Sequence, residues 1–328
     1  MAGMVTAARP KKTFSQKLHS RQGKQLGCIL AFATIPVFLL ILFTYYPFAE
    51  MVKFSFFKMK YIGPRKFVGW DNYAQIFKRK DIIRTLLLAL YYMVGSVVQV
   101  VLALYFATIL SFKVKGSKFF KGVLFFPYLI NGIAIGFIFK FFYTRGFVLA
   151  SVLQALGFDL NNLPYWLKDQ RINNWSLVYS SVWRYLGQNI ILFIGSIMSV
   201  DGVLYEAAEL DGANKFQTFW HVILPQIKTI VTLNIILSIT GSLSAFEPPY
   251  VITSGANGTG TFFVVMNTIA HTNQKVGLAS AMAVFLLCII FVATILQRLL
   301  FKYLFRNANN DDESLAAKKA HKKAAKAA

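Results

Sequence analysis

Acidic residues are scarce in this chain of 328 residues, where 13 Asp and Glu stand against 35 Lys and Arg. Charged residues of both signs make up 15% of the sequence, whereas a soluble globular domain carries about 25%. Hydrophobic residues account for 56%, and Phe alone occupies 32 positions. Because so few charges cannot cover the surface of a water-soluble domain, the composition indicates a single membrane-embedded unit.

Cysteine and histidine are also few, which excludes two kinds of site. Cys28 and Cys288 lie inside apolar runs and the four histidines are scattered, so neither a disulfide framework nor a metal cluster is expected. The nucleotide-binding pattern G-x-x-x-x-G-K-[ST] is absent, as are the catalytic patterns H-E-x-x-H and G-x-S-x-G. We therefore expect a chain that is not an enzyme and holds no cofactor of its own.

The net charge of +22 is distributed in a way that is typical of a membrane protein. The basic residues lie mainly in the two tails and between long apolar runs, where they set the orientation of membrane spans. We therefore do not interpret the charge as a nucleic-acid-binding surface, and we expect membrane lipid rather than nucleic acid around this chain.

Six apolar stretches are each about as long as the roughly 20 helical residues that cross a bilayer core. They run over Gly27–Pro47, Thr85–Leu110, Phe119–Tyr143, Trp175–Met198, Thr229–Phe246 and Val276–Leu300. The first is too long for a signal peptide and no small-residue cleavage site follows it, so we predict an uncleaved span. The predicted fold class is an all-α integral membrane protein with six transmembrane helices.

The same pattern predicts three regions along the chain. They are a basic N-terminal tail over 1–26, a six-span domain over 27–301, and a C-terminal tail over 302–328 whose Ala/Lys-rich end is predicted to be disordered. An inside N-terminus places 19 Lys and Arg in inner segments and 13 in outer ones. This bias predicts that both tails are cytoplasmic.

The inner connection over 199–226 has the pattern of two short helices rather than of a polar loop. Good helix formers run over Leu204–Asp211, Gly212 follows as a C-terminal cap, and a second apolar-faced helix over Phe216–Leu224 is predicted to end at Pro225. Two interpretations fit. The exposed carboxylates make this elbow a docking surface for another protein, or the two helices merely cover the inner end of the bundle.

One stretch of the elbow resembles a known motif. Glu206-Ala207-Ala208, then three residues, Gly212, then nine residues, and Val222-Ile223-Leu224-Pro225 resemble the EAA motif of permease subunits in binding-protein-dependent ABC importers, which has Ile in place of Val222. Stretches over 67–73, 246–254 and 277–281 look like the maltose-type carbohydrate permeases of this family. The resemblance covers about residues 27–305.

The resemblance implies a type I ABC importer permease in the bacterial inner membrane, which passes a sugar or oligosaccharide into the cytoplasm. Its implied partners are a second permease subunit, two ATPase subunits that bind ATP and Mg, and an extracytoplasmic sugar-binding protein. The elbow would be the coupling helix that contacts an ATPase. The implied coupling residues are Glu206, which makes a polar contact, Gly212, which makes the turn, and Ala207, Ala208, Asp211 and Pro225.

The fourth predicted span carries a polar stripe. Its residues are spaced i, i+3, i+4 and i+7 and so share one helical face: Ser181, Arg184, Tyr185 and Gln188. A charge halfway along a span is costly, so Arg184 either lines a translocation path or pairs with a carboxylate of another span. Asn131 in the third span either lines the path or bonds a neighbouring backbone. Small residues in the fifth span, from Asn234 to Ala245, favour close helix packing.

The resemblance places the sugar-contacting positions of the maltose permease on Ser181, Arg184, Tyr185, Gln188, Ser238, Ser242 and Glu247. Because arginine pairs bidentately with carboxylates, Arg184 suggests an acidic oligosaccharide of the uronate, alginate-like type. A secondary carrier or channel is the alternative, but the span interiors contain no Asp or Glu for an ion relay. A membrane enzyme acting on lipid or glycan is weaker still, because no carboxylate pair or nucleophile arrangement is evident.

Overall fold

The computed structural model describes residues 21–112 and 114–304, so most of the two predicted tails lies outside the described residues. Nearly all of this part is helical. The α-helices are α2 (Arg21–Leu40), α3 (Tyr46–Phe54), α4 (Asp71–Lys78), α5 (Lys80–Leu87), α6 (Ala89–Ser111), α7 (Ser117–Leu129), α8 (Gly132–Tyr143), α9 (Val148–Ala155), α10 (Asn173–Met198), α11 (Gly202–Leu210), α12 (Lys215–Thr218), α13 (Leu224–Leu243), α14 (Glu247–Val251), α15 (Phe262–His271) and α16 (Val276–Leu304). Two π-helical turns cover Ile41–Tyr45 and Phe219–Ile223, and a 3₁₀ turn covers Leu160–Asn162.

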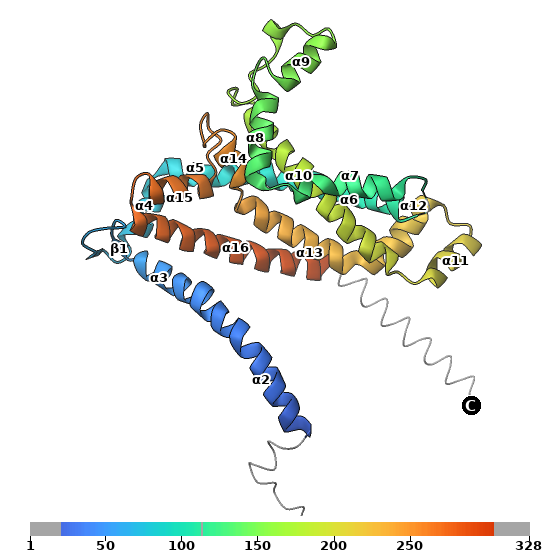
Figure 1. Ribbon diagram of the computed structural model, residues 1–328, viewed down its shortest axis with the longest axis horizontal. Coiled ribbons are helices and arrows are strands. Elements are labelled where there is room, and N and C mark those ends of the chain that lie inside the picture. The colour runs from blue at the N-terminus through green and yellow to red at the C-terminus, as the bar shows by residue number, and fades with distance from the viewer. Residues whose placement is uncertain (1–20, 113, 305–328) are drawn as a thin grey trace, which may run out of the picture.

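The long helices form a bundle with two different ends. α6, α10, α13 and α16 lie together, while α2 points away from them (Figure 1). The short helices α11 and α12 lie at one end of the bundle, and α4, α15 and a hairpin lie at the other (Figure 1). The hairpin pairs β1 (Phe57–Lys58) with β2 (Lys66–Phe67) in antiparallel register. The side-chain amide of Asn72 on α4 donates to the carbonyl oxygens of Ser55 and Phe57, which fixes α4 beside the hairpin.

Within the described residues, four helical stretches are long and apolar enough to cross a membrane. They are Ala31–Phe54, Lys80–Ser111, Lys215–Val251 and Val276–Tyr303. Two further pairs of helices meet the same test together but are bent, by 97° between α7 and α8 and by 76° between α10 and α11. Counting each bent pair once gives up to six spans, so the predicted all-α membrane fold is confirmed.

The third predicted span is not one straight helix, and this corrects the prediction over Phe119–Tyr143. α7 ends at Leu129, Ile130 and Asn131 are extended, and α8 leaves at 97°. The side-chain oxygen of Asn131 accepts a hydrogen bond from the backbone N–H of Ile133 at 2.8 Å, so Asn131 is the N-cap of a new helix. A window of apolar content cannot show this change of direction, because both halves are apolar.

The second arm of the elbow is also longer than predicted. It does not end at Pro225, since α12, the π-helical turn Phe219–Ile223 and α13 follow one another without a break. Pro225 lies at the second position of α13, next to the π-helical turn. Proline has no N–H to donate to the preceding turn, and the adjoining π turn changes the local hydrogen-bond pattern so that the helix continues past Pro225. The elbow therefore continues directly into the fifth span.

Buried side chains form three clusters along the bundle. One joins α6, α10 and α13 near the elbow, a second joins α4, α5, α15 and α16, and a third joins α6, α8, α10 and Ile252 directly after α14. Two glycines let backbones approach closely. A Cβ at Gly187 on α10 would overlap the carbonyl oxygen of Leu124 on α7, and one at Gly277 on α16 would overlap that of Phe57. Small residues of this kind are typical of membrane helix interfaces.

Candidate functional site

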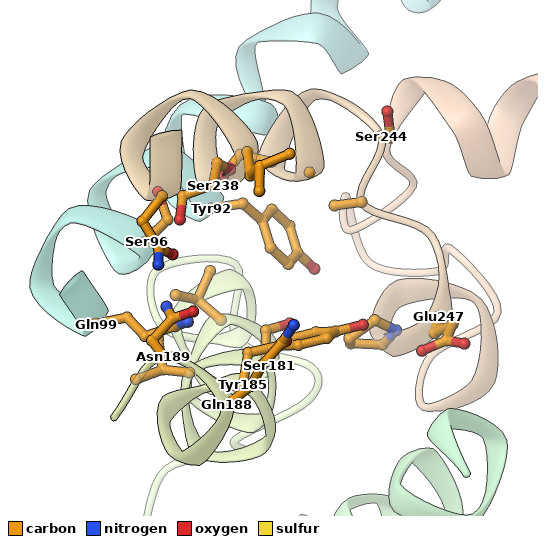
Figure 2. A pocket seen from close by; sticks show the side chains of 18 of the residues that line it. Tyr92, Ser96, Gln99, Ser181, Tyr185, Gln188, Asn189, Ser238, Ser244 and Glu247 are labelled. Atoms are coloured by element: carbon orange, nitrogen blue, oxygen red, sulfur yellow. Dashed lines mark hydrogen bonds between the residues drawn. The ribbon is translucent and has the colours of Figure 1, made fainter. Parts of the chain in front are cut away.

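A cavity of about 450 Å³ lies between α6, α10, α13 and the start of α14. This volume falls within the roughly 300–1,000 Å³ range of small-molecule sites. Figure 2 shows Glu247 at one end of the cavity, Ser96 and Gln99 at the opposite end, and Ser238 across from Ser181 and Tyr185. Three helices far apart in sequence therefore contribute to one chamber in the bundle, where polar side chains lie on a largely apolar wall.

The lining is rich in uncharged groups that form hydrogen bonds. The hydroxyl and amide side chains come from Ser96, Gln99, Ser181, Gln188, Asn189, Asn234, Ser238, Ser242 and Ser244. Aromatic rings of Tyr92, Tyr185 and Phe246 also line the cavity. Hydroxyls and amides both donate and accept hydrogen bonds, and aromatic faces pack on apolar ring surfaces. The cavity is chemically suited to a polyhydroxylated molecule.

Most of the predicted substrate-path residues meet at this cavity. It is lined by Ser181, Tyr185, Gln188, Ser238, Ser242 and Glu247. Arg184 instead lines a smaller pocket beside it, which also includes Glu247. Asn131 lines neither and is occupied as the cap of α8, so it bonds backbone of its own segment.

Sequence reasoning missed the contribution of the second span. Tyr92, Ser96 and Gln99 on α6 line the cavity, and their spacing of i, i+4 and i+7 places them on one helical face. The same test that found the stripe on the fourth span would have found this one. Asn234, which the sequence assigned to helix packing, is 5% exposed and also lines the cavity.

The partner of Arg184 is Glu247. Nη1 of Arg184 donates to Oε2 of Glu247, which joins α10 to α14. The structure thus favours the second sequence interpretation, in which the arginine pairs with a carboxylate, and that carboxylate belongs to the same chain. The hypothesis of an acidic substrate depended on a guanidinium that is open to the path, and here the guanidinium is already paired.

The elbow is an ordered structure with defined caps. The side chain of Asp201 caps α11 by accepting from the N–H of Val203 at 3.1 Å. Gly212 then turns the chain with a φ of +72°, in the left-handed region that favours glycine. Asn214 and Gln217 form a reciprocal capping box at the start of α12, with both bonds at 2.9 Å.

One side of the elbow is fixed to the bundle and the other faces outward. Ala208 is buried, and the hydroxyl of Tyr205 donates to the carbonyl oxygen of Ile197 at 3.2 Å. Burial raises the pKa of the Tyr205 phenol, so this hydroxyl stays protonated and can donate. The other predicted coupling residues are exposed, namely Glu206, Ala207, Asp211, Gly212 and Pro225.

Apolar side chains accompany these exposed carboxylates. Leu210 is 89% exposed and Phe216 71% exposed, and Val203 and Trp220 are exposed as well. Exposed apolar patches rimmed by polar residues occur both where proteins dock and where helices lie at a membrane surface, so this surface fits both interpretations of the elbow. Together, the membrane-length helices, the cavity between them and the ordered elbow at one end fit a multi-pass membrane transport component.

The chain belongs to the family of inner membrane components of binding-protein-dependent transport systems, whose family model matches residues 99–306. It is 34% identical to the probable ABC transporter permease protein YurN of Bacillus subtilis, over 82% of this chain and 94% of that one. It is 30% identical to the multiple sugar-binding transport system permease protein MsmF of Streptococcus mutans, over 81% of this chain and 92% of that one.

A solved structure has the same fold. It belongs to a bacterial alginate ABC transporter in complex with an alginate pentasaccharide-bound periplasmic protein, and the similarity covers 89% of this chain and 98% of that one. The TM-score is 0.74 with 17% sequence identity. The predicted membership of the EAA-motif permeases is confirmed, and the chain is a multi-pass membrane protein of a transport system.

Proposed function

We propose that this chain is the permease subunit that passes a sugar or oligosaccharide from an extracytoplasmic binding protein into the cytoplasm, driven by ATP hydrolysis in partner subunits. One observation carries the proposal: the cavity and the elbow share two helices. α10 runs from the cavity to α11, and α13 runs from the elbow back to the cavity. A displacement of the elbow is therefore transmitted to both walls of the cavity by rigid elements.

The partners follow from what the chain lacks and what its relatives do. No nucleotide-binding motif is present in its sequence, so ATP and Mg are assigned to two ATPase subunits that dock at Glu206 and the neighbouring exposed groups. The S. mutans relative serves a multiple sugar-binding system, and the alginate transporter was captured with a periplasmic protein. By analogy we assign a binding protein to the opposite end, and a second permease subunit as the partner of this chain in a heterodimer.

The membrane orientation is part of the proposal. ATPase subunits are cytoplasmic, so a docking elbow must face the cytoplasm. Six spans then place both termini on that same side, in agreement with the bias of Lys and Arg toward the inner segments. Closure of the ATPases would move the elbow and switch the cavity between outward and inward access, because the two states bind the ATPase dimer differently.

Transport assays with single components omitted test this function. Proteoliposomes that contain this chain, its partner permease and the ATPase subunits are loaded with ATP and given binding protein with radiolabelled neutral or uronic oligosaccharides. We expect uptake of one sugar class, falling at least tenfold when ATP is replaced by a non-hydrolysable analogue or when the binding protein is left out. Uptake by vesicles that contain the permease subunits alone would instead establish a secondary carrier or channel.

The hydroxyl of Tyr92 offers a sharper test of the cavity. It is buried and has no hydrogen-bond partner within the described part of the chain. An unpaired buried hydroxyl costs about 1–3 kcal/mol, and a sugar hydroxyl that reaches Tyr92 when the walls of the cavity move apart during transport would supply the missing partner. Tyr92→Phe is therefore expected to leave thermal stability unchanged or slightly raised. Sugar uptake should fall about fivefold to tenfold, which is the effect expected from the loss of one good hydrogen bond.

Tyr91→Phe is the matched control. Tyr91 is the next residue on α6 and does not line the cavity, and its ring packs edge-on against Trp175 with centroids 5.0 Å apart. The same loss of a hydroxyl there should leave uptake unchanged. Equal uptake by both variants would show that the Tyr92 hydroxyl does not contact the substrate.

A further inference from the structure

Two charged residues line the cavity and its side pocket within the part of the chain that the structure describes, and they neutralise each other. Glu247 borders both spaces and Arg184 borders the smaller one. The side-chain N–H of Arg184 donates to the carboxylate of Glu247. A charge at this depth of a span is costly unless it is paired. The pair therefore leaves the chamber with no net charge, although it contains an arginine.

The remaining contacts of the guanidinium also shield it from the cavity. Nη1 of Arg184 lies 3.2 Å from the hydroxyl oxygen of Tyr185, to which it donates, and the guanidinium carbon lies 4.9 Å from the centre of the Tyr185 ring. The Arg184 side chain is 15% exposed, whereas the Glu247 side chain is 41% exposed. Of the two charges, the carboxylate is thus the one that a molecule in the cavity meets first.

The local backbone holds this pair in place. Glu247 begins α14 and is followed by Pro248 and Pro249, whose rings restrict the backbone of the first turn. Gly132, directly after the break between α7 and α8, leaves the space that the pair occupies. A Cβ at this position would overlap both the Glu247 carboxylate and the Arg184 guanidinium. The bent third span and the short α14 thus both contribute to positioning the ion pair.

We propose that Glu247 is a specificity-determining residue, which neutralises Arg184 so that the cavity accepts neutral oligosaccharides and disfavours uronate-containing ones. This inference rests on the proposed function and names its substrate class. A uronate carboxylate would have to displace Glu247 from the guanidinium and leave two anions side by side. Sugar hydroxyls need no such exchange, because they can bond the amides, the hydroxyls and the exposed oxygens of Glu247.

The test measures sugar binding to the complete importer in nanodiscs with the binding protein omitted, because that protein imposes its own selectivity. Titration calorimetry at millimolar sugar compares neutral di- to tetrasaccharides with the same sugars oxidised to uronates at C6. We expect the wild type to bind the neutral form at least tenfold more tightly. Glu247→Gln should shift the uronate-to-neutral affinity ratio at least tenfold toward the uronate, since it releases the guanidinium.

A second variant keeps the inference testable if Glu247→Gln does not fold with an unpaired buried arginine. Arg184→Gln removes the guanidinium and leaves the half-exposed Glu247 carboxylate without its partner. This variant should lower the uronate-to-neutral affinity ratio at least threefold. Glu50→Gln is the matched control, because Glu50 pairs with the exposed Lys53 at 3.2 Å, on α3 and away from the cavity. It should leave the ratio unchanged.

The outcomes separate this inference from the function on which it rests. A wild type that prefers uronates, or a ratio that neither cavity variant changes, would overturn the role of Glu247 while the importer function stands. The proposed function itself would be contradicted by two results together. The importer would bind no sugar of the panel, and its ATP hydrolysis would not be stimulated by any of these sugars with the binding protein.

Discussion

Gly212→Pro is expected to abolish the stimulation of ATP hydrolysis by sugar-loaded binding protein in the reconstituted importer. Gly212 has a φ of +72°, whereas proline fixes φ near −65°. The substitution also removes the N–H that donates to the carbonyl oxygen of Glu209 at 3.0 Å, and it disturbs the neighbouring bond from Ala213 to Ala208 at 2.9 Å. α11 would then leave its position against the bundle, and the docking carboxylates would leave with it.

The expected magnitude follows from the lost turn. A left-handed conformation already costs an ordinary residue roughly 1–2 kcal/mol, the proline ring excludes it altogether, and the lost hydrogen bond costs about 1 kcal/mol more. At about 1.4 kcal/mol per factor of ten, the coupled conformation should be depleted by at least tenfold. Stimulated hydrolysis is measured beside the basal rate of the ATPase subunits, which this change should leave intact.

Gly202→Pro provides a control within the same elbow. Gly202 is the first residue of α11, where proline is well tolerated, and a Cβ there meets no other atom within 4 Å. The preceding Asp201 already has a φ of −60° and a ψ of 128°, which suits a residue before proline. This variant should couple normally. If both prolines abolished stimulation, or neither did, the turn at Gly212 would not be the coupling element.

The first arm of the elbow could be predicted from sequence because its structure is determined locally. The run of helix formers over Leu204–Asp211 and the left-handed glycine at 212 each depend on neighbours only a few residues away. The polar stripe on the fourth span was equally accessible, since a helix fixes which residues share a face. In both cases a short range of sequence contains all the physical causes.

The direction of helices and the partners of polar groups could not be predicted in the same way. The break at Asn131 lies inside an apolar run. The helix continues past Pro225 because the adjoining π turn changes the hydrogen-bond pattern at the residue that lacks an N–H. The partner of Arg184 lies 63 residues further along the chain, in a short helix that no periodicity indicates. Such features depend on tertiary packing, which a single sequence does not display.

Gly187→Ala is expected to separate two helices and lower the stability of the folded permease. The added Cβ would overlap the backbone carbonyl oxygen of Leu124 and lie 2.8 Å from the Cα atom of Phe125. Neither group is a flexible side chain that can move aside, so α7 or α10 must shift as a whole. Overpacking typically costs 1–3 kcal/mol, and a clash with backbone belongs at the upper end. The midpoint of thermal unfolding in nanodiscs should fall by about 5–10 °C.

Gly195→Ala on the same helix separates this steric effect from helix propensity. Gly195 is exposed and a Cβ there meets no atom within 4 Å, so alanine should preserve or raise stability by about 0.5–1 kcal/mol. Gly187 also lies one residue from Gln188 and three from Arg184, so a shift of α10 would move one wall of the cavity. Sugar uptake should therefore fall in Gly187→Ala even at temperatures where the variant is fully folded. Normal stability and uptake in Gly187→Ala would mean that α7 and α10 are not in backbone contact at Gly187.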